Sequence, residues 1–161
     1  MLNTSLFRSL IICLFGSWLL LAAGCVTKPS PGSVTLRQIN ISLGEVTNLI
    51  RKTIPLGIRT ISQNNREFFS QHFLLMDGKD YSPAKDSSTR YYARMLILNS
   101  SRPFDLEIEV LREVRQDVNG RIIYAADGYD LRLARLLKQQ VKEALSKRRD
   151  DLNLIDDFRV F

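Results

Sequence analysis

Histidine and cysteine, which serve many catalytic and metal sites, are nearly absent from this sequence. His72 is the only histidine, and the two cysteines, Cys13 and Cys25, both lie in the first 25 residues. A zinc site of the usual His/Cys type and a Ser/His/Asp or Cys/His triad therefore lack enough members. We expect a structural role for His72, no metal and no cofactor.

Glycine-rich loops and regular calcium loops are missing as well. No segment has the spacing of a phosphate cradle, and the stretch from Asp77 to Asp80 lacks the oxygen ligands and terminal Glu of a calcium loop. Asp77 with Asp80, and Asp156 with Asp157, are acidic pairs of the kind that glycosidases use, but each lies in a polar stretch that favours solvated charge. The sequence predicts no catalytic residue and no enzyme. A carboxylate-based hydrolase is the enzymatic alternative.

What is present is the composition of one ordinary globular domain. The 161 residues are 45% hydrophobic, 9% aromatic and 25% charged, which excludes a disordered chain and a membrane protein with several spans. Lys and Arg total 23 against 17 Asp and Glu, so the formal net charge is +6. A basic surface of this kind suits nucleic acid, anionic lipid or an acidic partner.

The first 25 residues have the layout of an export signal. A basic start precedes an apolar run from Leu10 to Leu21, which is shorter than the ~20 residues needed to span a bilayer. The run ends in Leu21-Ala22-Ala23-Gly24-Cys25. This ending resembles the lipobox of bacterial lipoproteins. That family prefers Leu three positions before the cysteine, where this chain has Ala22, with Leu21 one position earlier.

The resemblance implies a lipid anchor. In the family, the cysteine receives a diacylglycerol, the signal peptide is cut before it and the new amino group is usually acylated. Residues 1–24 are then the signal peptide and Cys25 is the lipidated residue, held stably on a membrane by two or three acyl chains. Val26, in place of the Asp that retains lipoproteins at the inner membrane, implies the outer membrane. An ordinary signal peptide or an apolar anchor is the alternative.

The remaining chain divides into a tether and one domain. Residues 25–33 contain two prolines and a glycine and are expected to form a tether. Residues 34–161 are expected to form a single periplasmic domain, with exposure at the cell surface left open. This domain has no cysteine, so its core alone must stabilise it. Nucleic acid is an unsuitable partner outside the cytoplasm.

Hydrophobic periodicity predicts the elements of this domain. A strand over 34–41 is followed by a helix that Ser42 caps, with Glu45 at capping-box spacing. Residues 58–75 fit a helix face about as well as two strands, and their β-branched residues favour a hairpin. Residues 77–88 are expected to form a polar loop.

The second half has clearer patterns. Strands are predicted over 91–98 and 104–118, the latter with one buried face and one wet acidic face. Asn119-Gly120 predicts a type I′ turn and an antiparallel return over 121–126. Asp127 or Asp130 is expected to cap a helix, and the apolar tail over 152–161 is expected to fold back onto the domain.

This order of elements predicts an α+β fold, with a mostly antiparallel sheet and two helices packed on one face. The layout resembles that of small envelope lipoproteins such as the outer-membrane lipopolysaccharide-assembly lipoprotein. That family pairs a sheet with two helices and plugs a β-barrel partner. The resemblance is one of layout and implies an accessory role.

The charge is concentrated on the last helix. Residues 131–149 hold seven basic residues against one acidic residue, which equals the net charge of the whole chain. A solvated face with basic stems is one interpretation. The other is a surface for anionic headgroups, lipopolysaccharide phosphate or an acidic partner, formed by Arg132, Arg135, Lys138, Lys142 and Arg149.

Two non-catalytic functions fit these features. The first is an accessory lipoprotein of an envelope assembly, transport or secretion machine. It would bind a protein partner and be attached to the membrane through its lipid. The alternative is a lipoprotein that binds peptidoglycan, lipid or lipopolysaccharide.

Overall fold

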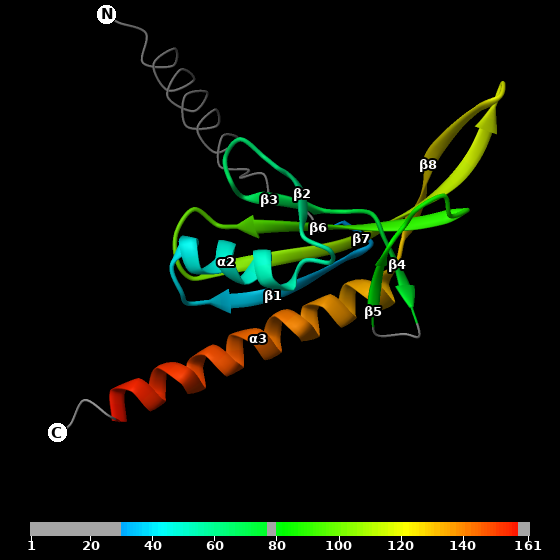
Figure 1. Ribbon diagram of the computed structural model, residues 1–161. Helices are drawn as coiled ribbons and strands as arrows, with labels where there is room; N and C mark the ends of the chain where they lie inside the picture. Colours follow the sequence, from blue (N-terminus) through cyan, green and yellow to red (C-terminus); the bar gives the residue numbers. More distant parts are fainter. Residues whose placement is uncertain (1–29, 77–79, 158–161) are drawn as a thin grey trace, which may run out of the picture.

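The structure is a computed structural model that describes residues 30–76 and 80–157, with side chains up to residue 148. It contains an eight-stranded antiparallel sheet and two helices, α2 (Leu43–Thr53) and α3 (Leu131–Asp157) (Figure 1). The predicted α+β class, with a mostly antiparallel sheet, is confirmed. The residues of the predicted signal peptide, Cys25 and Val26 lie outside the described residues.

Two long strands, β6 (Thr89–Leu98) and β7 (Phe104–Val118), form the centre of the sheet. They pair from Thr89↔Val114 to Leu98↔Asp105. The other edge of β7 carries β1 (Ser33–Ile39) along its first half and β8 (Arg121–Tyr129) along its second. On the far edge of β6 lie β3 (Glu67–Ser70) and β4 (Phe73–Met76).

The turn between β7 and β8 forms as predicted. Asn119 and Gly120 both have positive φ angles, of 56° and 76°, as a type I′ turn requires. The Gly120 N–H also donates to Asp117 Oδ1 at 2.8 Å. Beyond the end of β6, the two strands continue as a hairpin that projects from the body (Figure 1). We call residues 114–126 the arm.

The region from 58 to 83 forms two hairpins. β2 (Ile58–Ile61) pairs with β3, which confirms the predicted hairpin. The prediction of a polar loop over 77–88 is wrong in part, because β5 (Asp80–Pro83) pairs with β4. Tyr81 explains the difference: its ring packs edge-on against Phe73, with centroids 5.1 Å apart, and its hydroxyl donates to Gln140 of α3.

Both helices begin at side-chain caps. The Ser42 N–H donates to Glu45 Oε2 at 2.7 Å while the Glu45 N–H donates to Ser42 Oγ at 3.3 Å, which confirms the capping box. Asp130, and not Asp127, caps α3, accepting from the Leu133 N–H at 2.9 Å. α3 continues through Asp157 and its end projects past the sheet (Figure 1). Residues 152–157 therefore extend the helix, contrary to the expected return.

The core lies between the helices and one face of the sheet. The buried side chains of β3, β6 and β7 stand opposite one another across the ladders and point to the same face of the sheet. The buried residues of α2 and α3 cover this face. The fully covered members of these layers include Phe68, Met95, Leu106, Ile108, Val46, Ile50, Leu137 and Val141. This burial of apolar surface is the main stabilising contribution to the fold.

A glycine is needed where β1 and β8 approach one another. Gly32 is buried directly before β1, and a Cβ atom added there would overlap the side chain of Tyr129 at the end of β8. Gly44 is a useful contrast, because a Cβ on this exposed α2 residue would meet nothing within 4 Å.

We therefore expect Gly32→Ala to lower the free energy of unfolding by about 1–3 kcal/mol, the usual effect of overpacking. Gly44→Ala should be neutral or stabilising by up to about 1 kcal/mol, because alanine restricts the unfolded chain. Urea unfolding of both variants tests this. Equal stabilities for Gly32→Ala and the parent would contradict the contact with Tyr129.

Candidate functional site

The basic residues of α3 lie at several places along the helix, and Lys147 lines both a hollow on the outer side of α3 and a groove between α2 and α3. Arg135, Lys138 and Lys142 lie together along the side of the helix that faces away from the buried stripe. Arg132 lies near the start of the helix, beside Leu75 and Met76 of β4. The side chain of Arg149 is outside the described residues. The predicted surface is therefore smaller than the sequence indicated, and the hollow along Arg135, Lys138 and Lys142 is lined by one helix alone.

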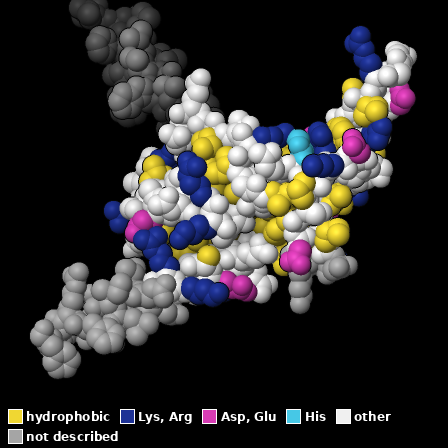
Figure 2. Space-filling model, viewed as in Figure 1, with side chains coloured by type: hydrophobic (Ala, Val, Ile, Leu, Met, Phe, Trp, Pro, Cys, Tyr) yellow, Lys and Arg dark blue, Asp and Glu magenta, His cyan; other side chains and the backbone are white. Residues whose placement is uncertain are grey.

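A second basic surface has two walls. A groove of about 690 Å³ runs between α2 and α3, lined by Asn48, Leu49, Arg51, Lys52, Ala144, Lys147 and Arg148. We call it the α2–α3 groove. Figure 2 shows Lys and Arg side chains gathered on the left of the view, over α2 and the neighbouring part of α3. Arg51 and Lys52 were not predicted as site residues.

One of the four cations in this groove is neutralised. Arg148 forms an ion pair with Glu45 at the start of α2 and thereby joins the two helices. The backbone and hydroxyl of Ser42 hold the pKa of Glu45 below its ordinary value, with a smaller contribution from Arg148. Arg51, Lys52 and Lys147 form no ion pair with any residue that the structure describes. The groove therefore presents positive charge to an anionic group.

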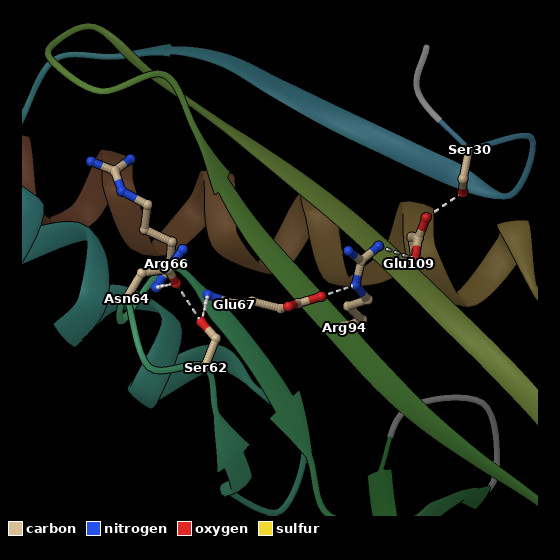
Figure 3. Close-up of polar contacts among 7 residues, drawn as sticks. All are labelled: Ser30, Ser62, Asn64, Arg66, Glu67, Arg94 and Glu109. Atoms are coloured by element: carbon tan, nitrogen blue, oxygen red, sulfur yellow. Dashed lines mark hydrogen bonds and ion pairs between the residues drawn. The ribbon is translucent and has the colours of Figure 1, made fainter. Parts of the chain in front are cut away.

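The opposite face of the sheet differs from the expected wet acidic face. Glu109 is only 3% exposed and Glu107 only 8%, so this part of the prediction is wrong. Arg94 of β6 explains the burial, since its Nη1 lies 2.9 Å from Glu109 Oε2 while its Nε binds Glu67 of β3 (Figure 3). Burial lowers the pKa of Arg94, and its hydrogen bonds with Glu109 and Glu67 more than reverse this effect.

The chain before β1 completes the cover over these carboxylates. The Ser30 N–H donates to Glu107 Oε1 at 3.3 Å, and the Ser30 hydroxyl donates to Glu109 (Figure 3). Residues 30–32 are thus attached to the sheet, so the expected tether over 25–33 is shorter at its C-terminal end. Charged groups of this burial are normally paired and hydrogen-bonded. Glu109 is both paired, with Arg94, and hydrogen-bonded, by Ser30, whereas Glu107 accepts the Ser30 N–H without a cation among the described residues.

His72 belongs to a further cluster on this face. Its Nε2 accepts from Arg59 Nη1 at 3.1 Å and lies 3.4 Å from Glu113, while its ring meets Tyr92 edge-on. Arg90 binds Glu113 at 2.6 Å. Burial, followed by the charges of Arg90 and Arg59, lowers the pKa of His72 below its ordinary value of 6.5, against the opposing charge of Glu113.

The described part of the chain contains neither a cluster of metal-binding side chains nor a helix suited to span a membrane. Residues 30–76 and 80–157 contain no group of three or more His, Cys, Asp or Glu side chains placed to bind a metal. None of their helices has the length and apolar character needed to cross a bilayer. Asp77 and the side chains of Asp156 and Asp157 lie outside the part that the structure describes, and Asp80 is exposed at the start of β5.

The lowered pKa of His72 predicts a pH dependence of stability. At pH values between the pKa of His72 in the folded protein and 6.5, the unfolded chain binds more protons than the native protein. The free energy of unfolding therefore rises with pH in this range, and this contribution is lost as the pH falls below 6.5. His72→Gln removes this contribution. Urea unfolding just below pH 6.5 should therefore depend less on pH in the variant. Identical pH slopes in parent and variant would contradict the argument.

Comparison with known proteins identifies no relative. No family model matches the chain, and neither the curated proteins nor the solved structures include a match.

Proposed function

We propose that this chain is a lipid-anchored, non-catalytic accessory protein of the bacterial cell envelope, which binds an acidic segment of a partner protein in the α2–α3 groove. The observation that carries the proposal is the groove itself, in which two helices hold Arg51, Lys52 and Lys147 beside one another. Charge of one sign in a walled groove favours a complementary partner and speeds its association.

The attachment of Ser30 supports a position close to a membrane. If Cys25 carries the lipid, only residues 25–29 separate the anchor from the point that Glu107 and Glu109 hold. Five extended residues span at most about 18 Å. The domain would then remain near the bilayer. In our proposal this bilayer is the outer membrane, because Val26 follows the cysteine.

The position of the groove favours a protein partner over the headgroups of the anchoring membrane. Ser30 is attached to the sheet face that carries Glu107 and Glu109, whereas α2 and α3 cover the other face. A helix is about 10 Å across, which exceeds the Debye length of about 8 Å at physiological salt. If the sheet face that holds Ser30 lies toward the bilayer, the cations on the helical layer are farther from its headgroups than this Debye length.

Lipidation is tested by Cys25→Ser. The variant should accumulate as an uncut precursor without lipid label, because serine has no thiol to acylate. Metabolic labelling with a fatty acid, followed by gel mobility, measures both properties. Normal labelling of the variant would show that Cys25 is not the anchor.

Partner binding is tested by reversing the charge of the groove in the full chain. The variant Arg51→Glu, Lys52→Glu, Lys147→Glu should yield at least ~10-fold less of a stoichiometric protein adduct after mild crosslinking in cells. Its matched control is Arg135→Glu, Lys138→Glu, Lys142→Glu, which makes the same charge change on the outward side of α3. Both variants should stay folded. Single surface substitutions usually change stability by less than about 0.5 kcal/mol, and loss of each cation at the C-terminal end of α2 costs about 0.3–1 kcal/mol more.

The controls separate the alternatives. Equal loss of the adduct in both variants would indicate general electrostatics and contradict a site in the groove. If no protein adduct forms and the groove variant instead loses binding to phosphatidylglycerol vesicles or lipopolysaccharide, the alternative of a lipid-binding lipoprotein replaces the proposal.

A further inference from the structure

The outer edge of β8 is unusually exposed and apolar. In the described residues, β7 is the only strand that pairs with β8. Ile122 and Ile123 of β8 are 54% and 44% exposed, and Val118 on the neighbouring strand is 45% exposed. The arm projects from the body, with hydrophobic side chains visible on it at the upper right of Figure 2. An exposed apolar edge of this kind is a template for another strand.

The sequence of β8 is complementary to itself in one antiparallel register. If two copies of β8 are aligned with Tyr124 opposite Tyr124, each isoleucine faces an alanine: Ile122 faces Ala126, and Ile123 faces Ala125. In the same register Arg121 faces Asp127 at both ends of the seven-residue segment. The two tyrosines oppose each other and opposite charges oppose each other, which are favourable cross-strand pairs. Each large isoleucine stands opposite a small alanine.

The regular ladder of β8 ends at Ala126, because β8 has one extra residue between Ala126 and Tyr129 where its pairing with β7 shifts. The Arg121–Asp127 pair therefore lies at the margin of the segment. Beyond Arg121 and Asp127 the next pair is Gly120, at the turn, opposite Gly128. Both glycines have positive φ angles, and a Cβ at either position would meet nothing within 4 Å. The turn of one copy therefore meets an open backbone position of the other. Asp127 already binds Arg112 on β7 at 2.8 Å, with about half of each side chain exposed, so a carboxylate bridge to a second cation is geometrically open.

From this we infer that β8 pairs antiparallel with β8 of a second copy of this chain, about a two-fold axis at Tyr124. The occupant is a second copy because the apolar and charged residues complement the same segment. The pairing joins two sheets through their arms and covers Ile122 and Ile123. It is independent of the function proposed for the α2–α3 groove, which lies on the helical layer.

The test measures the mass of the full chain in detergent micelles by analytical ultracentrifugation, over a series of protein concentrations. The parent should show a concentration-dependent dimer. Arg121→Asp and Asp127→Arg each place like charges opposite each other twice and should weaken the dimer by roughly tenfold. The double variant Arg121→Asp, Asp127→Arg restores opposite charges and should restore the dimer.

Arg115→Asp is the matched control, because Arg115 is an exposed arm residue on the inner strand β7 and its reversal should leave the dimer intact. A parent that remains monomeric throughout the series would overturn the inference. So would equal weakening by Arg115→Asp, or a double variant that dimerises no better than the single ones. Circular dichroism of each variant identifies one that has unfolded, and the double variant then decides the result.

Discussion

The fold depends on the burial of β7 on both of its sides, which require different kinds of cover. Leu106, Ile108 and Val110 point to one side and require an apolar cover, while Glu107 and Glu109 point to the other and are almost as deeply buried. The helices cover the apolar side. On the other side Arg94 and the Ser30 hydroxyl bind Glu109, and the Ser30 N–H binds Glu107. A buried carboxylate without its cation is strongly destabilising, so the positions of β6 and of the chain before β1 are both fixed by β7.

Much of the fold was predictable because its signals are local. The capping box at Ser42, the Asn119-Gly120 turn and the alternation along β7 each involve residues close in sequence, and the structure confirms them. The burial of Glu109 was not predictable, because its alternation with apolar residues looks the same for a wet face and a covered one. Only the partner strand determines that Arg94 stands opposite.

The same difference between local and distant information applies to the candidate site. The basic character of α3 was visible in the sequence, and so was the basic last turn of α2. That last turn also has a local explanation, because cations stabilise the C-terminal end of a helix. Its position beside Lys147 follows from the packing of α2 on α3, which the Glu45–Arg148 pair reinforces. The groove therefore emerges only when both helices are placed.

The attachment of Ser30 would have a mechanical consequence if the chain is held at its N-terminus, as we propose. A force applied in line with β1 through the preceding residues would load this strand along its length. The ladder between β1 and β7 runs from Ser33↔Glu109 to Ile39↔Phe104, so its hydrogen bonds would share a load applied along their strand and would not open one after another. The two bonds of Ser30 to Glu107 and Glu109 stand ahead of this ladder. For a pull in that direction, the N-terminal side of the fold would be loaded in shear.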